Sequence, residues 1–288
     1  MSNIRQAFRN GKAFIPFITC GDPDLESTKR DVRAAAEAGA DLIELGIPFS
    51  DPTAEGPVIQ AANLRALSGG VTTDAVFRMV AELREELTTP FVFMTYANVV
   101  FSYGIERFAA RAAACGIDGI ILPDVPFEEK EEFAPKFRAV GIDLISMIAP
   151  TSRARIRKIA ATAEGFLYVV SSLGVTGVRQ EICTDLSAML SVVREVNPEL
   201  PAAIGFGIST PEQARRMAEI ADGVIVGSAI IRIMAERGGE ADKEIARYVR
   251  EMKTAANTFQ SLLNVLKKNN TNEMREQAPK LSKNKKEE

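Results

Sequence analysis

The segment AEAGADLIELG (Ala36–Gly46) contains the pattern that decides the fold: the end of a helix, a glycine turn, an aspartate and a short apolar run. Related segments are AACGIDGIILPD (Ala113–Asp124), AVGIDLISMI (Ala139–Ile148) and AEIADGVIVGSA (Ala218–Ala229). Glycine suits the left-handed turn that ends a helix. Apolar runs without polar alternation are typical of parallel strands buried on both faces. The repeat therefore predicts successive βα units that build a parallel sheet.

Eight apolar runs of this kind alternate with eight helical patterns. The expected strands are Phe14–Ile18, Leu42–Leu45, Phe91–Thr95, Gly119–Ile121, Leu144–Ile148, Phe166–Val170, Ala202–Gly205 and Gly223–Val226. The expected helices are Leu25–Ala38, Thr73–Leu87, Ile105–Cys115, Glu128–Val140, Arg153–Thr162, Asp185–Val196, Thr210–Ile220 and Glu240–Thr258. Eight alternations favour a closed barrel over an open sheet. We predict an α/β fold, a single (β/α)8 TIM barrel with extra short helices.

The chain has 288 residues, and an α/β barrel of roughly 250 residues commonly forms one domain. We therefore expect a catalytic barrel over residues 1–260. Residues 261–288 are rich in Lys, Asn and Glu and have little to bury, which predicts a polar C-terminal tail, extended or partly helical.

Composition excludes several classes of protein. A net charge of −3 gives no electrostatic reason to expect nucleic acid or an anionic membrane as a partner. The three cysteines, Cys20, Cys115 and Cys183, show no close pairing, so neither a disulfide framework nor a CxxC metal site is indicated. The N-terminus lacks a signal peptide pattern, and no apolar run approaches the ~20 residues of a membrane span. These features predict a cytoplasmic protein without a metal site.

The chain contains no histidine. Acid–base chemistry near neutral pH must then fall to carboxylates, Tyr, Cys or Lys with shifted pKa values. Zinc sites built on histidine and Ser-His-Asp triads are excluded.

Active sites of TIM barrels lie in the loops that follow the strands. Glu44 stands two residues before the glycine that ends the second strand, which is unusual for a buried strand unless its side chain points into a pocket. A buried carboxyl group without a cationic partner has a raised pKa and can act as a general acid. The alternative is a glutamate satisfied by backbone donors or a lysine. Tyr168 also lies on an expected strand, where its hydroxyl group needs a polar partner, and it is a plausible auxiliary catalyst.

Three glycine-rich turns follow the sixth, seventh and eighth expected strands. They are Gly174–Gly177, Gly205–Ser209 and Gly227–Ala229. Glycine lets backbone N–H groups approach an anion, and the N-terminus of a short helix adds a favourable dipole. Tight βα turns also use glycine for structural reasons. Three such turns in this order nevertheless predict a phosphate site, which the last loops of this fold commonly form.

At this point the motifs closely resemble those of the tryptophan synthase alpha subunit family. The resemblance extends in order from about Phe14 to Asn257, and it rests on FITCGDP (Phe17–Pro23), ELGIPFSDP (Glu44–Pro52), YAN (Tyr96–Asn98), PDVP (Pro123–Pro126), GVTG (Gly174–Gly177) and GFGI (Gly205–Ile208). It implies the retro-aldol cleavage of indole-3-glycerol phosphate to indole and glyceraldehyde 3-phosphate.

The resemblance also implies roles for particular residues. Glu44 matches the general acid/base near indole C3, Glu55 the carboxylate beside the indole nitrogen, and Tyr168 the tyrosine next to the site. The phosphate-binding positions correspond to Gly177, Phe206, Gly207, Gly227 and Ser228. The walls of the indole pocket correspond to Phe17, Met94, Ile121 and Met147.

A partner is implied as well: a pyridoxal-phosphate beta subunit that receives indole through a tunnel, in an alpha2beta2 heterotetramer. The resemblance implies no cofactor in this chain. Asp51, Asn98 and Pro126 match the docking face for that subunit.

One position departs from the family pattern. The family commonly has Asp where this chain has Glu55, and the extra methylene shifts the charge by over an ångström unless the loop adjusts. A misplacement of about 1 Å can cost on the order of 100-fold in rate. Two alternatives therefore stay open: a stand-alone lyase that releases indole, and a weakly catalytic barrel that activates the beta subunit. Phosphate-binding isomerases and epimerases are disfavoured because those families use histidine, and indole-3-glycerol-phosphate synthase because it uses lysines at its strand ends.

Overall fold

The computed structural model describes residues 3–171, 179–205 and 207–258, with the backbone alone for residues 179–185. Nine strand segments form one sheet in the order β5-β4-β3-β2-β1-β9-β8-β7-β6, and every pair is parallel. Their bounds are β1 Ala13–Thr19, β2 Ile43–Gly46, β3 Phe91–Met94, β4 Gly119–Ile121, β5 Asp143–Leu144, β6 Ser146–Ile148, β7 Leu167–Val170, β8 Ala202–Gly205 and β9 Gly223–Val226.

The fifth expected strand appears as two segments because it serves two neighbours in turn. β5 pairs with β4, and β6 pairs with β7. Ile145 alone separates them, and its amide donates to the Ile120 carbonyl at 2.9 Å. The chain itself therefore closes the circle, and the predicted eight-stranded barrel is confirmed.

The pairing of β4 with this fifth strand ends early. The last register pair is Ile120 with Leu144, and no further pair joins the two strands in the described part of the chain. We call this place the seam; it is bordered by Leu122 and Pro123 after β4 and by Met147 and Ile148 of β6.

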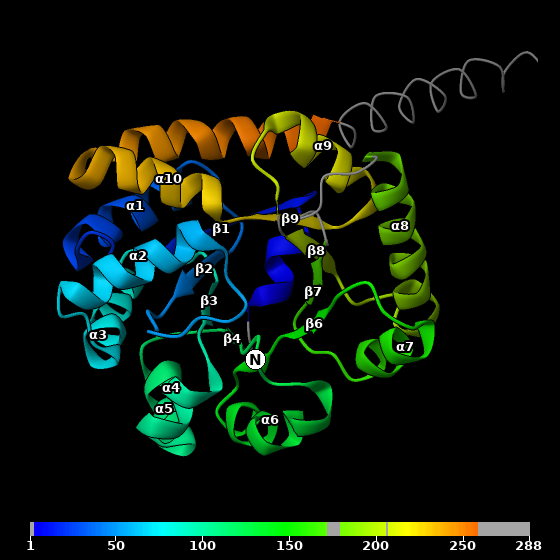
Figure 1. Cartoon of the computed structure of the whole chain (residues 1–288), viewed down its shortest axis with the longest axis horizontal. Coiled ribbons are helices and arrows are strands. Elements are labelled where there is room, and N and C mark those ends of the chain that lie inside the picture. The colour runs from blue at the N-terminus through cyan, green and yellow to red at the C-terminus, as the bar shows by residue number, and fades with distance from the viewer. Residues whose placement is uncertain (1–2, 172–178, 206, 259–288) are drawn as a thin grey trace, which may run out of the picture.

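Helices surround the strands as an outer ring (Figure 1). Their bounds are α1 Leu25–Glu37, α2 Pro57–Ser68, α3 Thr73–Arg84, α4 Ala97–Tyr103, α5 Ile105–Ala114, α6 Lys130–Ala139, α7 Arg153–Ala161, α8 Arg179–Val196, α9 Pro211–Ile220 and α10 Ser228–Arg237. Three 3-10 turns are η1 Ile4–Phe8, η2 Phe127–Glu129 and η3 Gly238–Glu240, and a last helix covers residues 242–258. None of the helices in the described ranges is both long and apolar enough to cross a membrane.

All eight expected helices are present, and three of their starts need correction. Glu128 belongs to η2, and α6 starts two residues later, at Lys130. The helix predicted from Asp185 begins at Arg179, because the preceding residues, which include Arg, Gln and Glu, are good helix formers that extend it. Glu240 belongs to η3, and the last helix starts two residues later. The extra helices are α2, α4 and α10, each of which follows a strand end. The predicted tail at 261–288 lies outside the described residues.

Side chains alternate between the two faces of each strand, so the hydrophobic core has two parts. Outward side chains pack under the helices in a large cluster, and inward ones, including Ile15, Val92 and Ile225, fill the barrel. The 3-10 turn η1 closes the lower end of the barrel: Ile4 is fully buried in the inner cluster, and the Phe8 ring lies 5.7 Å from that of Phe166. The opposite end, where the strands terminate, stays open for a site.

Candidate active site

A cavity of about 290 Å3 lies at the carboxyl ends of β1, β2, β3, β7 and β9. Its lining brings together both predicted catalytic glutamates, Tyr168 and the described parts of the phosphate turns: Glu44, Glu55, Tyr168, Gly207, Gly227 and Ser228. Residues that lie far apart in the sequence thus face one space.

Glu44 has a buried carboxyl group, and the described residues give it no hydrogen-bond partner. It pairs in register with Phe17 of β1 and Val92 of β3, so all three side chains point into the barrel at one level. Glu44 is 1% exposed, and neither of its carboxyl oxygens has a hydrogen-bond partner among the described residues. Burial, with repulsion from Glu55 as the second cause, raises the pKa of Glu44 to about 8. Glu44 therefore carries its proton at neutral pH and can deliver it.

Glu55 lies in the loop between β2 and α2, and that loop is held at several points. Asn63, a buried residue of α2, donates from Nδ2 to Glu55 Oε2 at 2.6 Å. Gln60 donates to the Glu55 carbonyl at 2.8 Å. Burial raises the pKa of Glu55 to about 7, and the bond from Asn63 opposes that rise. The carboxylate is thus fixed in place and close to its titration point at neutral pH.

Tyr96 holds the residue before Glu55 in the same loop. Its hydroxyl oxygen accepts a hydrogen bond from the Ala54 amide at 3.1 Å, and its ring stacks on Phe49 at 5.1 Å between centroids. Burial raises the pKa of Tyr96 far above its ordinary range, so the hydroxyl group stays neutral. Asn63 and Tyr96 therefore both restrain the position of Glu55.

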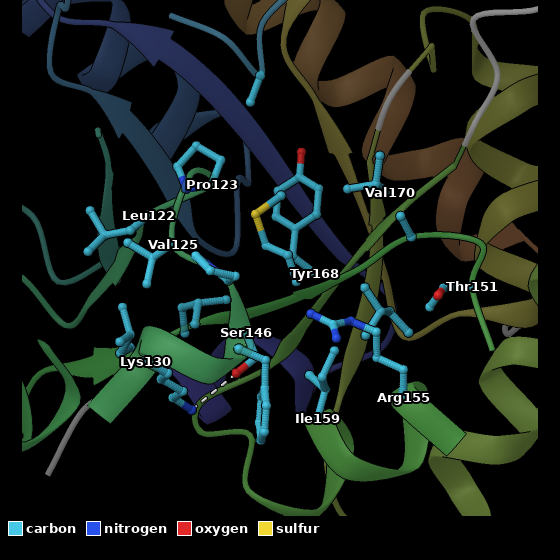
Figure 2. A pocket seen from close by; sticks show the side chains of 18 of the residues that line it. Leu122, Pro123, Val125, Lys130, Ser146, Thr151, Arg155, Ile159, Tyr168 and Val170 are labelled. Atoms are coloured by element: carbon cyan, nitrogen blue, oxygen red, sulfur yellow. Dashed lines mark hydrogen bonds between the residues drawn. The ribbon is translucent and has the colours of Figure 1, made fainter. Parts of the chain in front are cut away.

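Tyr168 stands on β7 beside the acid pair. Burial, and then the charge of Glu44, raises its pKa well above the ordinary value, so it can donate but does not ionise. Gly205 on β8 leaves the room that its ring needs, because a Cβ atom there would lie 2.4 Å from the hydroxyl oxygen. In Figure 2 the hydroxyl group of Tyr168 points away from Lys130 and Ser146.

The other end of the cavity suits an anion. Helix α10 begins at Ser228, next to Gly227, so its positive dipole end faces the cavity. Gly207 has φ +74°, a conformation that glycine adopts readily. Arg232, one turn into α10, also lines the cavity and adds a cation. The predicted phosphate residues Gly177 and Phe206 lie outside the described residues.

Comparisons with known proteins agree with this geometry. A family model described as "Tryptophan synthase alpha chain" matches residues 2–262. The tryptophan synthase alpha chain of Lacticaseibacillus casei is 49% identical over 255 residues, which cover 88% of this chain and 96% of that one. The protein of the same name from Lactiplantibacillus plantarum is 50% identical over 256 residues, covering 88% and 96%. A crystal structure of tryptophan synthase subunit alpha from Legionella pneumophila superposes with a TM-score of 0.80 at 37% identity, covering 89% of this chain and 99% of that chain.

The chain belongs to the tryptophan synthase alpha chain family. The resemblance seen in its motifs is thereby confirmed.

The residues expected to wall an indole pocket in this family fall in three places. Phe17 and Met94 line the active-site cavity. Met147 lines a second cavity of about 490 Å3, which shares Ala54, Met94 and Tyr168 with the first and reaches through the seam; we call it the seam cavity. Ile121 is buried inside the barrel, but it lines neither cavity.

The residues expected to contact a beta subunit are all exposed on loops or helix starts at this end of the barrel: Asp51, Asn98 and Pro126. Asp124 stabilises the surface between them, because both of its carboxylate oxygens accept from the Ala97 amide, at 3.0 and 3.1 Å. The described residues contain no cluster of three or more His, Cys, Asp or Glu that could hold a metal ion.

Sequence reasoning missed the roles of Asn63, Tyr96 and Arg232 in this alpha chain site. Asn63 lies on α2, a helix that was not predicted, eight residues after Glu55. Arg232 had a usable signal, since it lies four residues after Ser228 on the same helix face.

Proposed function

We propose that this chain catalyses the retro-aldol cleavage of indole-3-glycerol phosphate to indole and glyceraldehyde 3-phosphate, with Glu44 and Glu55 as the acid–base pair. Membership of the tryptophan synthase alpha chain family makes it a carbon–carbon lyase. One observation carries the assignment of residues: two carboxyl groups with raised pKa values share a cavity whose far end is the N-terminus of α10.

The first chemical step is protonation of the indole ring. Protonated Glu44 gives its proton to indole C3, and the electron pair of the C2–C3 double bond forms the new C–H bond. Positive charge then develops at the indole nitrogen, where the Glu55 carboxylate stabilises it. A preorganised charge in a site shielded from water is effective at this task.

The second step breaks the carbon–carbon bond. The Glu44 carboxylate, formed in the first step, accepts the proton of the hydroxyl group on the carbon attached to C3. The aldehyde carbonyl forms as that C–C bond breaks, and its electron pair returns to the indole ring. Glu44 ends the cycle protonated, so one residue serves as acid and then as base without a net change of charge.

Substrate orientation follows from the two ends of the cavity. The N–H groups at the start of α10, with Gly207, Gly227 and Ser228, receive the phosphate, and Arg232 adds a cation beside them. Phe17 and Met94 face the indole ring. We extend the family's roles to Met147 in the adjoining seam cavity, to Ile121, which lines neither cavity, and to the phosphate positions Gly177 and Phe206, which lie outside the described residues. Tyr168 donates a hydrogen bond to the reacting groups next to Glu44.

The partner is a beta subunit that carries pyridoxal phosphate, in a complex of two alpha and two beta subunits. Asp51, Asn98 and Pro126 form part of its docking face, and indole passes between the subunits. This chain needs no cofactor for its own step, and a cytoplasmic location suits its role.

The test is indole release from indole-3-glycerol phosphate by the purified chain, with and without a beta subunit. Slow release alone and strong acceleration with the partner support the proposal. Fast release without the partner would indicate a stand-alone lyase. No release in either case, with activation of the beta subunit preserved, would indicate a barrel retained for regulation.

A further inference from the structure

A buried lysine lines the seam cavity, and in the described part of the chain its ammonium group is hydrogen-bonded only to neutral groups. Lys130, the first residue of α6, is only 7% exposed. Its ammonium group donates to Ser146 Oγ at 3.1 Å and to the Thr162 carbonyl at 3.3 Å. The charges of Glu164, Glu131 and Asp143 act on Lys130, and Glu164 is itself paired with Arg138. Hydrogen bonds to neutral groups alone stabilise a buried cation less well than a direct ion pair does, so this position favours an anion.

The remaining hydrogen-bonding capacity of this pair is specific. An ammonium group has three donors, and two of those of Lys130 are used within the described residues. Ser146 Oγ accepts from Lys130, which leaves the hydroxyl hydrogen free to donate. Lys130 and Ser146 can therefore each give one hydrogen bond to the same two-oxygen acceptor.

The rest of the cavity is large and mostly apolar. About 490 Å3 is enough for a bicyclic ring, and the walls near the seam include Leu122, Val125 and Ile148. Met94 and Met147 add two thioethers, which make favourable contacts with aromatic rings. Figure 2 shows Lys130 and Ser146 together at one end, away from the hydroxyl group of Tyr168.

The charge balance indicates one negative charge rather than two. Arg155 also lines the cavity, but both of its terminal nitrogens are bonded to Glu128, at 3.0 and 2.9 Å. Arg155 is thus paired with a carboxylate, whereas the ammonium group of Lys130 is hydrogen-bonded to neutral groups alone among the described residues. A phosphate dianion would leave one charge buried without compensation.

We propose that the seam cavity is a second binding site, for an aromatic monocarboxylate. The carboxylate accepts hydrogen bonds from Lys130 Nζ and Ser146 Oγ, and the ring lies among the apolar residues of the seam.

Calorimetric titration of the full chain with naphthalene-2-carboxylate tests this site. Naphthalene-2-carboxamide, which has the same shape without the charge, is expected to bind at least about tenfold more weakly. Lys130→Met should weaken carboxylate binding by about 10- to 100-fold and leave carboxamide binding unchanged. Lys136→Met is the matched control, since Lys136 is a lysine of the same helix whose ammonium group bonds an exposed carbonyl. Equal carboxylate affinity in the Lys130 and Lys136 variants would overturn the proposal.

A second comparison locates the ligand. Ser228→Asp places a negative charge at the proposed phosphate end and should not change carboxylate affinity if the ligand lies in the seam cavity. Weakened binding in Ser228→Asp together with unchanged binding in Lys130→Met would assign the carboxylate to the phosphate end and refute the seam site. If Lys130→Met does not fold, Ser146→Ala replaces it. That variant removes one donor and should weaken binding by about fivefold or more, and unchanged affinity would contradict the proposal.

Discussion

Glu44 combines two properties that are seldom found together, complete burial and a carboxyl group without a hydrogen-bond partner among the described residues. Such a group destabilises the folded state, because an unsatisfied buried polar group costs about 1–3 kcal/mol. Its presence therefore indicates a chemical role. Its inward position opposite Phe17 and Val92 places it where substrate atoms would supply the missing partners.

Glu44→Gln should abolish cleavage and leave the binding of phosphate ligands unchanged, because it removes the transferable proton and keeps the shape. We expect kcat to fall by at least about 1000-fold, within the range lost with an essential acid–base group. Single-turnover indole release and calorimetry with a phosphate ligand measure the two effects separately. Retained turnover would refute Glu44 as the proton donor.

Asn63 is a positioning residue for Glu55, and its loss should have a signature in the pH profile. The wild-type rate requires protonated Glu44 and ionised Glu55, so kcat/KM should peak between about pH 7 and pH 8. The bond from Asn63 lowers the pKa of Glu55, so Asn63→Ala should raise that pKa and move the acidic limb to higher pH. We also expect kcat to fall about tenfold with little change in KM. Gln60→Ala, which removes only a bond to the Glu55 backbone, serves as the control; identical profiles in both variants would exclude the role.

Helix α9 illustrates how local sequence sets an element of the barrel. Thr210 accepts from the Gln213 amide at 3.3 Å, and Gln213 Oε1 accepts from the Thr210 amide at 3.1 Å, which forms a capping box. Gln213 also accepts from the Ser209 amide at 2.9 Å, so the box fixes the end of the glycine turn after β8. Residues of that turn line the anion end of the active-site cavity.

Thr210→Ala should destabilise the protein by about 1 kcal/mol, since it removes the side-chain acceptor that caps α9. Urea denaturation measures the change, with Thr88→Ala at an exposed position as the control. A loss no greater than that of the control would show that the cap contributes nothing.

The strands could be predicted within a residue or two because each is an apolar run that follows a helix end. The break at Ile145 could not, since it depends on β4 and β7 competing for one strand and not on the strand's own residues. Glu44 and Ser228 were recognisable because each stands at a strand end in a marked motif. Asn63 was not, because its function comes from a hydrogen bond to a residue on another element.

The whole molecule should lose stability as the pH rises, because of its buried acids. Burial raises the pKa of Glu44 to about 8 and that of Asp31 to about 7, so the folded state binds these protons more tightly than the unfolded state does. The contribution of Glu44 and Asp31 to the free energy of unfolding is fully present below about pH 4 and is lost progressively as the pH rises to about 8.

Glu44→Gln should therefore be more stable than the wild type at pH 8, by on the order of 4 kcal/mol, since each pKa unit corresponds to about 1.4 kcal/mol. The advantage should shrink toward pH 4.5. Melting temperatures of both proteins across pH 4.5–8 measure it. Parallel curves would mean that Glu44 is not strained by burial.

The 3-10 turn η1 is synthesised before every strand of the barrel, and it can take its place only after much later residues have been added. Its contacts are to residues far along the chain: the Asn3 amide donates to Asp118 Oδ1 at 2.9 Å, and Phe8 packs on Phe166. The ribosome must therefore add more than half of the barrel before these partners exist, and the bond from Asn3 closes a loop of 115 residues. Until those residues are made, Ile4 and Phe8 belong to an unanchored segment, and the lower end of the barrel is closed only after its strands are in place.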